Sequence, residues 1–244
     1  MTQTVICMKW GTRYGPDFVN RLHSMVQRHT TRPTRLVCYT DHREGIRGEV
    51  EVYPLPHIEL PEYRRWFPWR KISLWQKELQ GISGEVLYLD LDVVVTGDLD
   101  GFFDYKPGHY CVARNWTQPK ERIGNTSVYR FPVGGHTYLY DRIMSDCEDV
   151  LARHRNSQTY ISREIEDMEF WPDEWCVSFK HSLLPVWPLN FFLVPGLPSG
   201  TKVVAFTGKP DPDEAMEGRW PHKHWYQGLY KRVRPTPWIA EHWR

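Results

Sequence analysis

The sequence predicts an α/β fold in which helices flank a mostly parallel sheet. Three observations support this prediction. The first forty residues read as strand, helix and strand, residues 85–95 contain an apolar run typical of a buried strand, and the 244-residue chain is 41% hydrophobic and 25% charged. A chain of this length and ordinary composition can bury one large core without disulfide or metal support, so we expect a single domain.

The N-terminal elements follow from local patterns. Thr4–Met8 is a short apolar, β-branched run, and Arg35–Thr40 is a second run of the same type. Between them, residues 17–28 carry apolar side chains at helical spacing, namely Phe18, Leu22, Met25 and Val26. A strand, helix and strand in this order favour parallel pairing, because the helix supplies the crossover.

Two further elements lead to the centre of the chain. Lys71–Leu79 has the apolar spacing of a helix that stops near Gly81, and Glu85–Val95 reads as a strand buried on both faces. Asp90 and Asp92 interrupt that apolar run. Residues two apart on a strand point the same way, so both carboxylates are expected near the carboxyl end of the strand, where open α/β sheets bind ligands.

A pair of carboxylates at this place suits a hard divalent cation. Mg²⁺ or Mn²⁺ is commonly held by one or two carboxylates together with the phosphates of a substrate. Asp90 and Asp92 therefore predict a site for a metal and a nucleotide diphosphate. The alternative is that the two residues only cap a turn, as we expect for Asp98-Leu99-Asp100 and Asp211-Pro212-Asp213.

Composition excludes several other classes. The net charge of +1 removes the field on which nonspecific nucleic-acid binding depends, so no nucleic-acid partner is expected. No run approaches the ~18 apolar residues of a membrane span, and the first residues lack the pattern of a secretory signal. We therefore expect a cytoplasmic protein. Five widely spaced cysteines argue against a disulfide framework or a cysteine-rich zinc site.

The stretch VLYLDLDVVVTGDLDGFF resembles the metal-binding strand of the glycosyltransferases of family 8, the glycogenin and lipooligosaccharide galactosyltransferase type. MKWGTRYGPDFVNRL, CYTDHREGI and WCVSFK resemble a bacterial branch of that superfamily more closely. The resemblance extends over nearly the whole chain. It implies a GT-A-type, Rossmann-like fold with a mixed, mostly parallel sheet, and a hexosyltransferase-type activity.

The resemblance also implies roles for individual residues. Asp90 and Asp92 match the D-x-D that holds Mn²⁺ or Mg²⁺ with the diphosphate, and Lys71 matches a basic residue that contacts the donor. A lysine there can meet a phosphate, although a solvated helix-end lysine is an equal alternative. The loop from Lys9 to Tyr14 falls where the family receives the base and ribose. The donor-binding residues expected on this basis are Lys9, Trp10, Gly11, Tyr14, Asp41, Lys71 and Gly208.

Three residues are expected at the transferred sugar or the phosphate. Asn125 matches an asparagine beside the sugar, Gln158 is retained from a G-D-Q motif, and Lys209 matches a lysine that touches phosphate. Two positions depart from the family. Ser157 replaces the aspartate of G-D-Q, and Ala205 or Thr207 stands where the family has its third metal ligand, a histidine. His222 or His224 would have to fold back to replace that histidine.

These observations leave three hypotheses. The first is a metal-dependent, retaining glycosyltransferase that uses a nucleotide diphosphate sugar, with uridine diphosphate (UDP) as the expected nucleotide. The second is a nucleotide-sugar-binding or glycan-binding protein on the same fold whose activity has decayed, because Ser157 and Thr207 alter two site positions. The third is a metal-independent enzyme, against which the intact Asp90 and Asp92 argue.

The acceptor, an unidentified glycan, lipid or small molecule, is expected to meet aromatic and basic residues. One such cluster is Arg64, Arg65, Trp66, Trp69 and Arg70. Residues 1–217 are expected to form the catalytic domain, and residues 218–244 a basic, aromatic tail that packs on it or closes over it. Such a tail is also compatible with peripheral contact to an anionic membrane surface.

Overall fold

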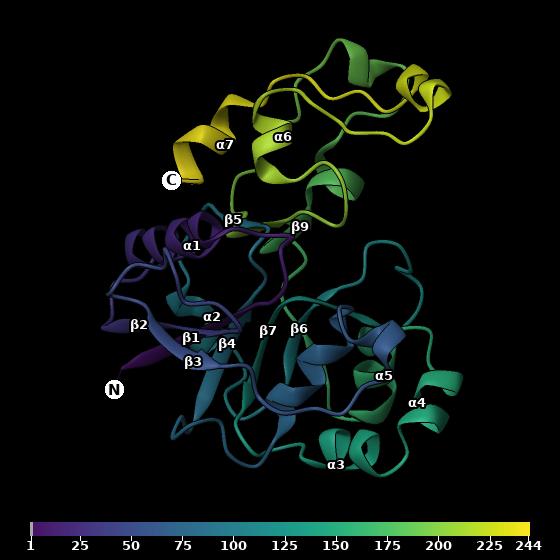
Figure 1. The fold of residues 1–244 in the computed structure, drawn as a ribbon. Helices are drawn as coiled ribbons and strands as arrows, with labels where there is room; N and C mark the ends of the chain where they lie inside the picture. The colour runs from purple at the N-terminus through teal and green to yellow at the C-terminus, as the bar shows by residue number, and fades with distance from the viewer. Residues whose placement is uncertain (1) are drawn as a thin grey trace.

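A computed structural model describes residues 2–244. Its ten strands are β1 (Gln3–Lys9), β2 (Thr34–Thr40), β3 (Glu51–Pro54), β4 (Glu85–Leu89), β5 (Val93–Val95), β6 (Cys111–Arg114), β7 (Gly124–Pro132), β8 (Glu169–Phe170), β9 (Cys176–Ser178) and β10 (Val203–Ala205). Seven strands form a central sheet in the order β3-β2-β1-β4-β7-β6-β8, and β5-β10-β9 form a second, smaller sheet (Figure 1).

The central sheet is mixed and mostly parallel, as expected. β1 pairs in parallel with β2 and β4, β2 with β3, and β6 with β8, whereas β7 is antiparallel to both β4 and β6. Helix α1 (Pro16–Arg28) is the predicted crossover between β1 and β2, and Pro16 at its first position suits a helix start. Its buried side chains are Val19, Leu22, Met25 and Val26.

Successive residues of the central strands face opposite layers of the core. Val5 and Cys7 of β1 pack in the layer that contains α1 and the small sheet. Ile6 and Met8 pack in the other layer, with helices α3 (Tyr138–Ser145) and α5 (Ser157–Glu164). The sheet is therefore covered on both faces, which explains why its strands are continuously apolar. Two short helices, α2 (Asp100–Asp104) and α4 (Cys147–Arg153), complete this part of the chain.

The expected single strand over residues 85–95 is two strands in two sheets. β4 ends at Leu89, and β5 begins at Val93 in the small sheet. The prediction was wrong here because an apolar run shows burial but not which strand it pairs with. Asp90 still donates its backbone N–H to the Ser127 carbonyl (2.9 Å), while the Asp92 carbonyl accepts from the backbone N–H of Phe206 (3.2 Å). The D-x-D segment is the bend between the sheets.

The expected helix over Lys71–Leu79 is also different. A 3₁₀ helix, η2, runs over Pro68–Trp75, and Gln76 then adopts an extended backbone. The side-chain amide of Gln76 donates to the Ser73 carbonyl (2.9 Å) and so closes the last turn. All residues from Lys71 to Trp75 are buried, which an amphipathic α-helix would not allow. A shorter 3₁₀ helix, η1 (Glu62–Arg64), precedes it.

The last third of the chain builds on the small sheet. It contains a π-helical turn η3 (Phe179–Leu183), the 3₁₀ helices η4 (Leu189–Phe191) and η5 (Trp225–Leu229), and helices α6 (Pro212–Met216) and α7 (Pro237–His242). Figure 1 shows these elements at the top of the molecule, with α7 beside α1. None of the helices described over residues 2–244 has the length and apolar character needed to cross a bilayer.

Candidate functional site

A cavity of about 710 Å³ opens at the carboxyl ends of β1 and β4. The loop after β1, the D-x-D bend, β7, the first turn of α5 and the segment after β10 all contribute to its wall. The lining residues are Met8, Trp10, Gly11, Thr12, Arg13, Tyr14, Trp66, Pro68, Lys71, Asp90, Leu91, Asp92, Thr126, Ser127, Asn156, Ser157, Gln158, Phe206, Thr207 and Gly208. This is the place at which open α/β sheets receive ligands.

Lys71 and Asp90 form an ion pair in this cavity. The Lys71 Nζ lies 2.6 Å from Asp90 Oδ1, and the lysine side chain is 6% exposed. The same ammonium donates to the Thr126 carbonyl (3.0 Å), and the Tyr88 hydroxyl donates to Asp90 Oδ1 (2.9 Å). One oxygen of Asp90 is thus held by two donors. The 3₁₀ helix η2 places Lys71, which is buried, at the wall of the cavity.

Asp92 is held by a neutral partner instead. The Tyr14 hydroxyl donates to Asp92 Oδ2 at 2.7 Å. Burial, together with the charge of nearby Asp90, raises the pKa of Asp92 to about 7. Burial and the Asp92 carboxylate likewise raise the pKa of Tyr14 well above its usual range. The pair Asp90 and Asp92 therefore holds more negative charge than Lys71 compensates, and a further cation would relieve the repulsion.

The donor set fits a hard cation with few protein ligands. Asp90 Oδ1 and Asp92 Oδ2 are engaged by hydrogen-bond donors, which leaves the second oxygen of each carboxylate for a metal. Within residues 2–244 no group of three or more histidine, cysteine, aspartate or glutamate side chains is arranged to hold a metal ion. Two carboxylates with the remaining positions filled by phosphate and water suit Mg²⁺ or Mn²⁺.

The loop after β1 forms one wall of the cavity. Gly11 has φ +62°, a left-handed conformation that favours glycine, and a Cβ at this position would lie 3.3 Å from the Trp66 ring. Its backbone N–H donates to Asp41 Oδ2 (2.9 Å). Asp41 itself lies outside the cavity wall, so its observed contact is to the loop. Trp10 donates its indole N–H to the Trp66 carbonyl (3.2 Å).

Arg13 is a cavity residue that sequence reasoning did not single out. Its guanidinium lies 3.4 Å from Asp211 Oδ1 and 4.9 Å from the centroid of the Tyr14 ring. A second cation thus stands beside the tyrosine that holds Asp92. Only its place within the segment Lys9 to Tyr14 pointed to it.

Three other predicted site residues lie outside the cavity wall. Lys209 is turned to α6, where its Nζ lies 2.7 Å from Asp211 Oδ2 and 2.6 Å from Glu214 Oε1. Asn125 is buried in β7 and its Oδ1 accepts from the Ser127 backbone N–H (3.0 Å), so Thr126 and Ser127 line the cavity in its stead. Lys9 is buried at the end of β1, paired in register with Thr40.

Of the positions that depart from the family, Ser157 and Thr207 line the cavity, whereas Ala205, the alternative to Thr207, is buried in β10. Ser157 and the predicted Gln158 lie in the first turn of α5, whose N-cap Asn156 accepts from the Thr159 backbone N–H (2.9 Å). Thr207 lies opposite, with its hydroxyl 3.3 Å from the Ser178 hydroxyl. His222 and His224 are exposed near η5 and do not contribute to the wall.

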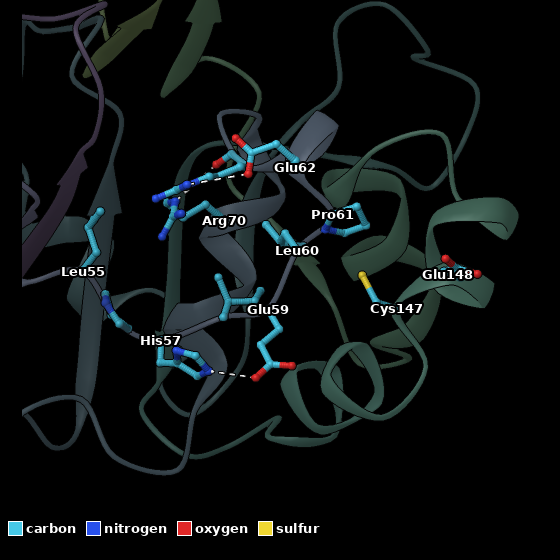
Figure 2. A pocket seen from close by; sticks show the side chains of 12 residues that line it. Leu55, His57, Glu59, Leu60, Pro61, Glu62, Arg70, Cys147 and Glu148 are labelled. Carbon is cyan, nitrogen blue, oxygen red and sulfur yellow. Dashed lines mark hydrogen bonds and ion pairs between the residues drawn. The ribbon is translucent and has the colours of Figure 1, made fainter.

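A second cavity of about 650 Å³ lies along residues 55–62 (Figure 2). Four of its side chains are exposed and form pairs: His57 with Glu59, and Arg65 with Glu62, each at 3.6 Å. The predicted acceptor cluster is divided between locations. Arg65 and Arg70 line this second cavity, Trp66 lines the first one, and Trp69 is buried in the core.

The fold is that of the GT-A glycosyltransferases. The galactosyltransferase LgtC, solved with donor and acceptor sugar analogues, matches with a TM-score of 0.60 at 12% identity, over 86% of this chain and 89% of that one. Mouse xyloside xylosyltransferase 1 matches with a TM-score of 0.54 at 13% identity, over 86% of this chain and 98% of that one.

GlyE of Streptococcus pneumoniae TIGR4, also a glycosyltransferase, matches with a TM-score of 0.54 at 13% identity. This match extends over 86% of this chain but only 56% of GlyE, so the common part is little more than half of that protein. No family model matches the sequence, and a search of curated proteins finds no match. The similarity to these enzymes therefore lies in the fold, as expected from the residues around the D-x-D.

Proposed function

We propose that the protein is a glycosyltransferase that uses a nucleotide diphosphate sugar, with UDP as the nucleotide, and a divalent cation. The observation that carries the proposal is the constellation of Asp90, Asp92 and Lys71 in one wall of a large cavity at the carboxyl ends of β1 and β4. The GT-A fold supports it, because the proteins of this fold that match the chain are glycosyltransferases.

The residues of the chain supply binding and charge compensation. Asp90 and Asp92 would hold Mg²⁺ or Mn²⁺, which neutralises charge on the departing diphosphate. Lys71 can transfer its interaction from Asp90 to a phosphate oxygen, and Arg13 stands close enough to the carboxylates to contribute a second positive charge. Trp10, Gly11 and Tyr14 form the wall expected to receive the nucleoside.

The reaction breaks the bond between the anomeric carbon and the diphosphate, and forms a bond to an acceptor hydroxyl. The acceptor proton passes to the leaving phosphate oxygen, so no strong protein base is required and Ser157 is tolerated. Retention of configuration and a glycan acceptor are part of the proposal. Gln158 lies on the cavity wall where it can hydrogen-bond a sugar hydroxyl.

A thermal-shift titration tests the donor site. A ligand that binds only the folded state raises the melting temperature, by an amount set by its concentration relative to Kd. We expect UDP with Mn²⁺ to stabilise the protein, and UDP alone, guanosine diphosphate or thymidine diphosphate to do so less. Asp90→Asn removes the shift, whereas Asp213→Asn, in a D-x-D outside the cavity, retains it.

A turnover assay on the same protein, added to this titration, separates the alternative. If a nucleotide stabilises the protein but no sugar is released from a panel of nucleotide sugars, then the protein is a binding protein on the GT-A fold. The replacement of the family's aspartate and histidine by Ser157 and Thr207, both on the cavity wall, is the observation that favours this second function. An absence of any shift would contradict both.

A further inference from the structure

Two segments of the last third of the chain form a surface with exposed apolar side chains. They are residues 186–194 and 225–230, hereafter the aromatic lobe, which Figure 1 shows at the top of the molecule, away from the central sheet. Trp187 is 66% exposed, Phe192 76% and Trp225 82%, and leucine, valine and tyrosine side chains beside them are also exposed. Apolar groups clustered in this way mark an interaction surface.

Hydrogen bonds hold the two segments of the aromatic lobe together. The Asn190 side chain is 2% exposed and donates to the carbonyls of Tyr230 and Arg232, both at 2.9 Å. The Trp187 indole donates to the Leu229 carbonyl at 3.3 Å. These bonds join residues 186–194 to the segment that contains residues 225–230.

The segments that contain the aromatic lobe are basic, and of their cations Arg219 is paired with Glu217 outside them. Residues 179–200 and 218–240 contain six lysines and arginines and no aspartate or glutamate. The whole chain has a net charge of +1, so the remainder carries a net charge of −5. Lys223, Arg232 and Arg234 are exposed, and the Arg232 guanidinium lies 5.9 Å from the centroid of the Phe191 ring. Cations beside exposed tryptophan and tyrosine complement the phosphates and the interfacial region of an anionic bilayer.

We propose that the aromatic lobe docks the protein on an anionic membrane surface. The tryptophan and phenylalanine rings enter the headgroup region, and the surrounding lysines and arginines neutralise lipid phosphates. The docking surface is connected to the candidate site: β10 leads directly from the small sheet to Thr207 and Gly208 on the cavity wall, and Phe206 stacks on Phe179, which begins η3. Membrane binding does not require the proposed transferase activity.

The structure also shows which part of the tail, residues 218–244, can contact a membrane. The end of the chain packs on the core: Ile239 and Trp243 are buried, and Arg21 of α1 lies 4.0 Å from the centroid of the Trp243 ring. The segment beyond Thr236 is therefore a structural element. The exposed aromatic side chains of the expected tail lie in residues 225–230. Residues 186–194 lie against this segment, and sequence reasoning did not connect the two.

Sedimentation with vesicles tests the proposal. We expect the protein to pellet with vesicles of phosphatidylcholine containing about one third phosphatidylglycerol, not with phosphatidylcholine alone, and less at high salt. The triple variant Trp187→Ser, Phe192→Ser, Trp225→Ser is expected to bind roughly tenfold or more weakly. Lys223→Ala and Arg234→Ala are each expected to weaken binding by roughly fivefold. Tyr63→Ser and Lys120→Ala, exposed residues of other segments, leave it unchanged.

A fluorescence measurement covers the case in which the triple variant does not fold. Lipids with brominated acyl chains quench the emission of tryptophans that enter the bilayer, and Trp187→Phe with Trp225→Phe should abolish that quenching while vesicle binding persists. Failure of the wild-type protein to bind anionic vesicles overturns the proposal, as does equal binding by the folded triple variant. A wild-type dimer that the triple variant converts to a monomer, without vesicle binding, would assign the lobe to self-association instead.

Discussion

The Lys71 Nζ lies 2.6 Å from Asp90 Oδ1, and a buried lysine thus stands beside a pair of carboxylates suited to a divalent cation. The ammonium balances one of the two negative charges while Asp92 keeps only the neutral Tyr14 hydroxyl as a donor. The site is therefore compensated in part without metal. This arrangement makes separate predictions for Lys71, Asp92 and Tyr14.

Lys71→Met should destabilise the protein by about 3 kcal/mol, because it leaves the Asp90 carboxylate without its cation. Adding Asp90→Asn should recover part of that loss, so the double variant is more stable than the sum of the single changes predicts. Urea unfolding measures the cycle, with the exposed Lys77→Met as the control that changes little. Strict additivity of the two single variants would show that the ion pair contributes no coupling.

The stability of the metal-free protein should fall as pH rises from about 4 to about 7. The folded pKa of Asp92 is raised to about 7 from a usual value of 3.8, so the folded state binds the proton more tightly. The stabilisation is complete below the unfolded pKa and is lost as pH passes the folded pKa. Melting temperatures measured in a chelator should show this fall for the wild type relative to Asp92→Asn. Parallel profiles of the two proteins would contradict it.

Tyr14→Phe should weaken Mn²⁺ binding and shift its pH dependence upward. The hydroxyl favours the ionised form of Asp92, and without it the carboxyl holds its proton to higher pH. The ring still packs on Phe18, with 4.8 Å between centroids, so the loss of stability is limited to about 1–2 kcal/mol. Calorimetric titration of Mn²⁺ at several pH values measures the shift. Phe18→Leu, which alters packing alone, should leave the pH dependence in place.

Gly11→Ala should weaken nucleotide binding, whereas Gly81→Ala should not. Both glycines have positive φ, +62° and +75°, so each substitution costs about 1 kcal/mol in backbone strain. Only at Gly11 does the added Cβ meet a neighbour, the Trp66 ring at 3.3 Å, while nothing lies within 4 Å at Gly81. The nucleotide-induced thermal shift separates the two effects. Equal loss of the shift in both variants would mean that the loop conformation is not part of the site.

Strands and helices were predictable from the sequence where a single local pattern of apolar residues determines them. The sequence correctly predicted helix α1 and the strands around residues 4–8 and 35–40. A β-branched run indicates a buried strand, and an apolar stripe indicates a helix with one buried face, without reference to other parts of the chain. Two elements were not predictable in this way. The run 85–95 divides between two sheets, and Lys71–Leu79 is not an α-helix, because strand partners and burial on all sides are set by residues far away in the chain.

The candidate site was predictable to the same extent. Eight predicted residues line the cavity: Trp10, Gly11, Tyr14, Lys71, Asp90, Asp92, Gln158 and Gly208. Lys9, Asp41, Asn125 and Lys209 lie off the wall, and the roles of all twelve residues stay predictions. Arg13, Thr126 and Phe206 had no distinctive motif to point to them.

The sequence by itself determined the class of fold and the two carboxylates at the end of a buried strand, because apolar periodicity and its interruption are local properties. Only the tertiary structure decided which side chains hold those carboxylates. The bond from Tyr14 to Asp92 joins residues 78 apart, and the contact between Trp187 and Leu229 joins residues 42 apart. Such partners depend on the path of the chain, and so the charge balance of the cavity and the exposed aromatic lobe emerge only once the chain is folded.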